Sequence, residues 1–189
     1  MHLSQFLRAF FLWLMATCIC AGSAIPQYIS AQYTAKARFL ANSPEFVQWP
    51  EAAFRSPTSS LLICVYGDFS FGTTLAVMVG GTSAHGHRKE VKWIRKEQDL
   101  PGCQVLFISH SVAKHYEKVL EVVKSSATLT IGEDGDFLKA GGMVSLDMAS
   151  STLIFDVNLD AVRGGQLRLS SQLLSLARHI IQRSEPTRS

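Results

Sequence analysis

The chain has 189 residues, of which 47% are hydrophobic and 17% charged, and its formal net charge is +3. This length favours one domain, and the composition lies in the globular range, away from disordered, collagenous and coiled-coil classes. The 18 basic and 15 acidic residues are spread along the chain rather than gathered into a basic stripe. The sequence therefore disfavours binding to DNA or RNA.

The first two dozen residues have the pattern of a secretory signal peptide. Arg8 carries the one formal charge of a short start, residues 9–20 form a nearly unbroken apolar run, and small residues occupy 21–24. These three features in this order are typical of a cleaved signal. A membrane anchor is the alternative, but a spanning helix needs about 20 apolar residues. We expect residues 1–24 to be removed on export, which leaves a single domain at 25–189.

Removal of the signal changes the meaning of the cysteines, because Cys18 and Cys20 leave with it and only Cys64 and Cys103 remain. In an oxidising compartment such a pair usually forms a disulfide. Closing a loop of about 40 residues contributes roughly 4 kcal/mol in the chain-entropy model. Cys64 lies in a predicted strand and Cys103 just before another, so neighbouring parallel strands would bring them within bridging distance. Two unrelated buried cysteines are the alternative.

Helix-like and strand-like segments alternate along the rest of the chain. Apolar residues three or four apart mark the helices, and short apolar or alternating runs mark the strands. Ser111 is placed as the N-cap of one helix, and the last two strands form a hairpin with a three-residue connection. The predicted helices are 32–46, 69–79, 111–124 and 169–182, and the predicted strands are 60–65, 90–94, 105–108, 128–131, 143–148 and 152–158.

This alternation predicts an α/β fold with a mostly parallel sheet, right-handed crossovers and an antiparallel hairpin at one margin. In parallel sheets small ligands bind outside the carboxyl ends of the strands, at a switch in strand order. If the sheet has a switch point there, the residues at these ends line a rim for a ligand or partner. A filled, inert rim is the alternative. The six residues are Gly67, Asp68, Ser109, His110, Gly132 and Glu133.

Catalytic and metal-binding motifs are weak. His85-Gly86-His87 is the nearest to a metal motif, but no third ligand is near in sequence, which favours a solvated loop. The chain has no G-x-S-x-G, and both mature thiols are expected to pair, so an enzyme is disfavoured. Asp68 follows a strand and is expected to cap the next helix rather than to help bind an anion, because the P-loop lysine is missing. We expect no catalytic residues, no metal and no cofactor.

An ordered series of segments resembles the YfiR family of bacterial periplasmic proteins, over almost the whole mature chain. The resemblance implies a compact three-layer α/β/α sandwich, location in the periplasm, no stable membrane insertion after cleavage, and a homodimer. It implies no catalytic residues. The segments are WP at 49–50, LICVYGD at 62–68, GCQVLFI at 102–108, TIGE at 130–133, GGM at 141–143, FDVNL at 155–159 and LSSQLL at 169–174.

The function that this resemblance implies is regulatory. The namesake of the family represses an inner-membrane diguanylate cyclase through the periplasmic sensor domain of that enzyme, and so lowers cyclic-di-GMP signalling and affects biofilm formation. Extending this role to the present chain is an analogy from family to function. A periplasmic small-ligand sensor or solute-binding module is the alternative. With one mature cysteine pair, a redox switch that needs a second pair has no support in the sequence.

Overall fold

The structure is a computed structural model, and it describes residues 31–183 except 69 and 72. The predicted signal peptide lies outside these residues. Two β-sheets are present in this part of the chain, a large one and a two-stranded one formed by β1 and β9. Within these residues, no helix is long and apolar enough to cross a membrane. The strands are β1 (Val47–Gln48), β2 (Leu61–Tyr66), β3 (Ser83–Ala84), β4 (His87–Ile94), β5 (Val105–Ile108), β6 (Leu129–Gly132), β7 (Val144–Ala149), β8 (Thr152–Asn158), β9 (Arg168–Leu169) and β10 (His179–Ile181).

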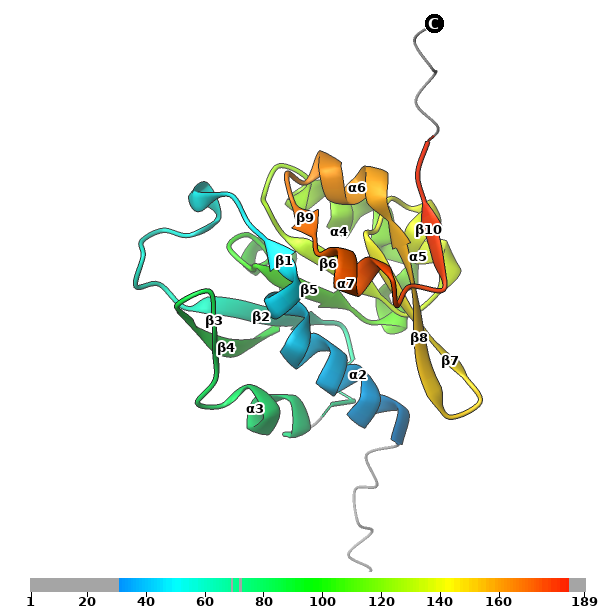
Figure 1. Ribbon diagram of the computed structural model, residues 1–189, viewed down its shortest axis with the longest axis horizontal. Coiled ribbons are helices and arrows are strands. Elements are labelled where there is room, and N and C mark those ends of the chain that lie inside the picture. The colour runs from blue at the N-terminus through cyan, green and yellow to red at the C-terminus, as the bar shows by residue number, and fades with distance from the viewer. Residues whose placement is uncertain (1–30, 69, 72, 184–189) are drawn as a thin grey trace, which may run out of the picture.

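The large sheet is mostly parallel, with strand order β10-β8-β7-β6-β5-β2-β4-β3 (Figure 1). Strands β4, β2, β5, β6 and β7 run parallel, β7 and β8 form the antiparallel hairpin, and β10 runs parallel to β8 at that margin. From β2 the chain moves to β4 on one side, and then to β5, β6 and β7 on the other side. The strand order therefore switches between β2 and β5.

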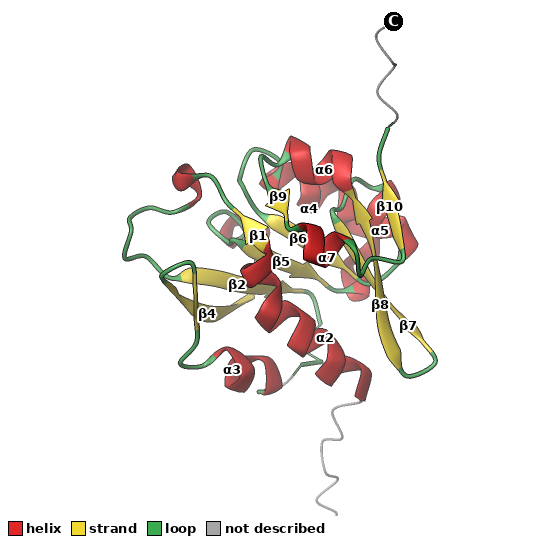
Figure 2. Cartoon of the chain, in the orientation of Figure 1, coloured by secondary structure: helices red, strands yellow, loops and turns green. Residues whose placement is uncertain are grey.

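Helices cover both faces of this sheet, which confirms the predicted α/β/α sandwich (Figure 2). Alternate side chains of β2 enter two separate cores, with Ile63 and Val65 in one and Cys64 in the other, as the two-residue period of a strand requires. The first core includes α2, α3, α6 and α7, and the second includes α4 and α5. The helices are α2 (Ala31–Asn42), α3 (Thr74–Val79), α4 (Tyr116–Val123), α5 (Gly135–Lys139), α6 (Leu159–Gly164) and α7 (Ser171–Leu174), with 3-10 turns η1 (Ser43–Phe46), η2 (Glu51–Ala53), η3 (Glu97–Asp99) and η4 (His110–His115).

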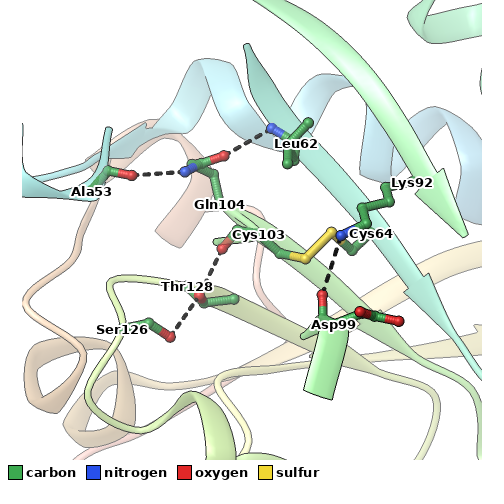
Figure 3. The surroundings of a disulfide bond; sticks show 9 residues. All are labelled: Ala53, Leu62, Cys64, Lys92, Asp99, Cys103, Gln104, Ser126 and Thr128. Atoms are coloured by element: carbon green, nitrogen blue, oxygen red, sulfur yellow. Dashed lines mark hydrogen bonds between the residues drawn. A yellow bond between two sulfur atoms is a disulfide. The ribbon is translucent and has the colours of Figure 1, made fainter. Parts of the chain in front are cut away.

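The predicted disulfide between Cys64 and Cys103 is present and buried (Figure 3). It joins β2 to the start of β5, which are neighbours in the sheet, and the two Cα atoms lie 5.9 Å apart. Beside it, the side-chain amide of Gln104 donates to Ala53 O at 2.7 Å and its Oε1 accepts the Leu62 N–H at 2.8 Å. The loop before β2 is thereby fixed to the same pair of strands.

The predicted helix at 169–182 is wrong. Leu169 pairs with Val47 in the small sheet, α7 covers only Ser171–Leu174, and β10 pairs with β8. The Arg178 N–H donates to Phe155 O of β8 at 2.8 Å instead of continuing a helix. Residues with the apolar spacing of one helix thus form a short helix followed by a strand. The strand forms because the open margin of the sheet offers it backbone partners, which the helical period of the sequence does not reveal.

The other predicted helices near the rim also differ in detail. The helix predicted at 69–79 begins only at Thr74, so Asp68 is not its N-cap. The helix predicted at 111–124 is η4 followed by α4, and the cap is Ser109, whose Oγ accepts the Ser111 N–H at 3.2 Å. Ser111 is therefore free to serve another backbone group, described below.

Two further corrections concern turns. The acidic run at 133–136, whose composition is typical of a turn, instead leads into a helix, because Asp134 Oδ1 accepts the Phe137 N–H at 2.9 Å and caps α5. The hairpin connection between β7 and β8 has two residues, Ser150 and Ser151, rather than three, and Ser150 has φ +58°. A two-residue hairpin turn commonly needs such a positive φ.

Candidate functional site

The carboxyl ends of β2, β5 and β6 lie side by side at the point where the strand order switches. The Asp68 N–H donates to Ser111 Oγ at 2.9 Å, which joins the segments that follow β2 and β5. The His110 N–H donates to Glu133 Oε2 at 2.8 Å, which joins the segments that follow β5 and β6. The structure thus gathers the six predicted residues, Gly67, Asp68, Ser109, His110, Gly132 and Glu133, at one edge, here called the carboxyl rim.

Two glycines allow this close approach. Gly67 has φ +101°, and a Cβ built there would lie 2.8 Å from Ser111 Oγ and 3.0 Å from Ser109 Cβ. A Cβ at Gly132 would overlap the buried ring of Phe137. Both positions therefore require glycine, the first for its backbone conformation as well as its size.

A buried ion pair ties α2 to the rim. Lys36 Nζ lies 2.7 Å from Glu133 Oε1, and the two side chains are only 8% and 7% exposed. The second oxygen of Glu133 accepts the His110 N–H, and Lys36 Nζ also lies 5.1 Å from the ring centroid of Tyr33. A buried ion pair of this kind persists because both carboxylate oxygens have partners, and losing one partner would leave an uncompensated charge.

Asp134 is the centre of the second half of the network. Its Oδ1 caps α5, and its Oδ2 accepts hydrogen bonds from His110 Nδ1 at 2.6 Å and from the Tyr116 hydroxyl at 3.0 Å. The Ser145 hydroxyl donates to the backbone oxygen of Asp134 at 2.7 Å. The carboxylate of Asp134 therefore joins η4, α4 and α5, and its backbone oxygen adds β7.

The pKa values follow from this arrangement. Partial burial raises the pKa of the Asp134 carboxyl, but hydrogen bonds from His110, the Phe137 amide and Tyr116 outweigh it, so the pKa lies below its usual range. The hydrogen bond to Asp134 and its charge raise the pKa of His110. Burial, followed by the same charge, raises the pKa of Tyr116. At neutral pH the rim therefore holds a charged Asp134 and a neutral Tyr116, and the imidazole of His110 binds a proton more readily than a free one.

Most polar groups of the rim are satisfied by one another, while a few face solvent. The His110 side chain is 71% exposed, and Asp68 and Ser111 are also exposed. Ser111 Oγ accepts from a backbone amide. The exposed groups form a fixed set of hydrogen-bonding positions, which suits recognition of a surface or a small polar molecule.

The two histidines of His85-Gly86-His87 lie elsewhere, at the start of β4. His85 Nε2 hydrogen-bonds to Pro44 O at 2.9 Å, and His87 Nδ1 hydrogen-bonds to Ser59 O at 2.7 Å. The His87 ring stacks on Phe54 with 3.8 Å between centroids. Both histidines line a hollow of about 640 Å³. Within the described residues no group of three or more His, Cys, Asp or Glu side chains could hold a metal ion.

Sequence reasoning missed three members of the network: Lys36, Asp134 and Tyr116. Lys36 interrupts the apolar stripe of the first helix beside Ala37, and a cation on an apolar face signals a buried partner. Asp134 stands three residues before Phe137, the spacing of an N-cap and its amide. Tyr116 lies among apolar residues at helical spacing, and this pattern carries no sign of its hydroxyl partner.

The fold is similar to several solved structures. One is the ABC domain in complex with L-Trp from Streptococcus pneumonia, with TM-score 0.53 and 9% identity over 78% of this chain and 60% of that one. Another is a conserved domain protein from Vibrio cholerae, with TM-score 0.48 and 12% identity over 64% of this chain and 54% of that one. The present chain thus spans less than two thirds of the length of either structure. At these identities the likeness concerns the fold alone.

The sequence itself provides the more specific relationship. The family described as YfiR/HmsC-like matches residues 33–178. This range begins in α2 and ends just before β10, so it includes the disulfide, the carboxyl rim and nearly all of the sheet. The chain therefore belongs to the YfiR/HmsC-like family, as the ordered segments of its sequence predicted.

Proposed function

We propose that this protein is exported to the periplasm, where it binds the periplasmic sensor domain of an inner-membrane diguanylate cyclase and restrains the enzyme. The observation that carries the proposal is the family match over residues 33–178, which covers most of the described domain. The apolar N-terminal segment and the buried disulfide support an oxidising destination outside the cytoplasm. We further propose that residues 25–189 form the mature, single-domain protein.

The carboxyl rim is the proposed contact surface. Its backbone is fixed by hydrogen bonds between the segments after β2, β5 and β6, and by the Lys36–Glu133 pair beneath them. A surface that is already ordered loses little conformational entropy on binding. His110 and Asp68 are the exposed side chains that a partner would meet first.

The thermodynamic requirement on such a repressor is modest. A binding partner shifts a two-state enzyme only by as much as its affinity for the two states differs. Moving a sensor domain from 1:99 to 99:1 in favour of the inactive state takes about 5.5 kcal/mol of preference. An interface of about 1,600 Å² supports affinities well above that difference. Repression therefore needs no chemistry from this protein.

Deletion of the gene tests the proposed function. Cyclic-di-GMP and biofilm formation should rise in the deletion strain, and the full chain should restore both. A version without residues 1–24 should stay in the cytoplasm and fail to complement. Unchanged cyclic-di-GMP in a host that expresses the cyclase would contradict repression.

A pair of histidine variants tests the rim. His110→Ala should weaken repression, because it removes an exposed group that hydrogen-bonds to Asp134 at 2.6 Å. His115→Ala is the matched control, since His115 is also exposed and lies five residues further along the same segment. Equal repression by the two variants, both folded and both oxidised at Cys64, would exclude the rim around His110 as the contact.

The strand order also favours a second candidate, a small-ligand sensor that uses the same rim. In open α/β sheets ligands bind at the switch in strand order, and here that switch lies between β2 and β5. Thermal unfolding in the presence of periplasmic extract fractions tests this candidate. A fraction that raises the unfolding temperature of the native chain but not of His110→Ala would support it, and no shift in any fraction would reject it.

We also propose that the mature protein is a homodimer. Sedimentation at micromolar concentration should give twice the mass of one mature chain. A single species with the mass of one chain would reject this proposal and leave the proposed repression untouched, because a monomer can also bind a sensor domain.

A further inference from the structure

Strand β10 ends the sheet with an apolar edge. Among the described residues it pairs with β8 on one side and with no strand on the other. Its isoleucines are exposed to 43% at Ile180 and 49% at Ile181, and the nearby Leu176 is 68% exposed. Edge strands of monomeric proteins are usually protected by charges, proline or a covering element. Here the strand sequence is His-Ile-Ile, and it carries none of these residues.

The backbone of β10 also has an open side. The Arg178 N–H donates to Phe155 O of β8 at 2.8 Å. Along a strand, successive residues turn their N–H and C=O groups to opposite sides, so those of His179 and Ile181 point away from β8. These groups are the donors and acceptors that a further strand would need.

The opposite edge of the sheet is built differently. Strand β3 has only two residues and pairs with His87 and Arg88 of β4. The rest of β4 is Lys89, Glu90, Val91, Lys92, Trp93 and Ile94, of which three are charged. Short length and charge discourage pairing at that edge, and β10 has only the first of these protections.

We infer that two copies of this chain pair through their β10 strands, antiparallel about a two-fold axis at Ile180. In this register His179 lies opposite Ile181 of the second copy, and each such pair uses the outward backbone groups of both residues. Arg178 would lie opposite Gln182, so no like charges face each other, and Arg178 is already neutralised by Asp147 and Asp156. A two-fold interface must be self-complementary. Strand β10 meets this requirement, because in this register its outward backbone groups face those of the second copy and no like charges lie opposite each other.

The inference names the surface of the homodimer proposed above and is independent of the proposed repression. Ile181→Pro tests it, because proline removes an N–H that points away from β8 and is tolerated at such edge positions. The dissociation constant of the dimer should rise at least about tenfold. Val77→Lys is the matched control, since Val77 is 75% exposed on α3, and it should leave the dissociation constant unchanged. Thermal unfolding of each variant checks that the fold is retained.

Cysteine cross-linking provides the second measurement, which does not depend on weakening the dimer. Directly opposite residues of an antiparallel pair have Cβ atoms about 5 Å apart, so Ile180→Cys should form a disulfide-linked dimer under mild oxidation. Cys64 and Cys103 are already paired with each other, and Val77→Cys should remain uncross-linked. A native dimer that Ile181→Pro does not weaken and Ile180→Cys does not cross-link would overturn the β10 assignment. A monomeric native chain would overturn the homodimer itself.

Discussion

The carboxyl rim and the β10 edge are both margins of the same sheet, but they treat polar groups in opposite ways. At the rim, Glu133 and Asp134 accept hydrogen bonds through both of their carboxylate oxygens, and a lysine on α2 balances the charge. At β10, backbone groups point outward and the isoleucines are about half exposed. The polar groups of the rim are bonded largely to one another, whereas in our proposal the strand of a second copy completes the edge.

This difference separates two kinds of contact. A margin whose groups are already bonded offers a rigid surface and binds through the few groups left exposed, which favours selectivity over strength. A margin with open backbone groups accepts any strand of suitable register. We therefore propose that the rim binds the partner protein and that the edge binds a second copy of this chain. Stability measurements on variants of the two margins test this division.

Loss of the buried cation should have the largest effect. Lys36→Met leaves Glu133, whose side chain is 7% exposed, without its counter-charge, and should lower the free energy of unfolding by about 3–5 kcal/mol. Urea denaturation measures the change. Lys118→Met removes a cation that is 66% exposed from a pair of the same length with Glu97, and its midpoint should not move. The variant Lys36→Met/Glu133→Leu should recover much of the loss, and failure to do so would mean that packing rather than charge dominates.

Removal of the disulfide should have the next largest effect. Cys64→Ala opens the link between β2 and β5 and should destabilise the fold by about 2–4 kcal/mol. The switch in strand order lies between these two strands, so the loss should also loosen the rim. Hydrogen exchange at the Asp68 and His110 amides should accelerate in the variant, while exchange at Arg178 beside β10 should change less. Free-thiol titration of the unfolded, unreduced mature protein should find no reactive thiol.

The sequence predicted much of what lies at the centre of the sheet and little of its margins. Strands such as β5 and β6 are buried on both faces, so their short apolar runs were diagnostic. The disulfide could be predicted because only two cysteines remain after export, one in a predicted strand and one just before another. The six rim residues could be placed because the carboxyl ends of parallel strands share one edge.

The prediction failed at the margins of the sheet because the structure there depends on partners far away in sequence. Residues 169–182 keep a helical period, yet the Arg178 amide is bonded to Phe155 of β8. Likewise the Lys36–Glu133 pair spans 97 positions, which no local pattern can show. Helix α6 was missed although it has a local sign, since Asn158 Oδ1 accepts the Ala161 N–H as an N-cap.

A smaller loss is expected at Asp134. Asp134→Ala removes the cap of α5 and the acceptor of the hydroxyl of the buried Tyr116, and should lower the free energy of unfolding by about 2 kcal/mol. Asp136→Ala is the control, because this neighbouring carboxylate is 79% exposed and bonds only to Lys139 among the contacts described. A loss at Asp136 equal to that at Asp134 would mean that α5 responds to charge in general rather than to this cap.

The pH dependence of the free energy of unfolding should reflect the hydrogen-bonded pair of Asp134 and His110. The pKa of Asp134 is lowered from 3.8 in the folded protein, so its contribution is present above pH 3.8 and is lost as pH falls through the lowered value. The pKa of His110 is raised from 6.5, so its contribution is complete below pH 6.5 and is lost as pH rises through the raised value. The native chain should therefore be more stable than His110→Ala mainly between the lowered pKa of Asp134 and the raised pKa of His110. A difference that instead grows above pH 8 would contradict the interaction.

The smallest effect is expected at the β10 edge. Ile180→Val and Ile131→Val each remove one methylene group from an isoleucine of the same sheet, but Ile131 is fully buried and Ile180 is 43% exposed. The buried change should lower the free energy of unfolding by about 0.5–1.5 kcal/mol, and the edge change by less than about 0.5 kcal/mol, measured where the protein is dilute enough to be monomeric. At higher protein concentration Ile180→Val should lower the free energy of unfolding further, because unfolding then also separates the two copies. A cost at Ile180 that is independent of concentration would show that the isoleucine serves the fold of one chain, and its exposure would no longer indicate a second copy.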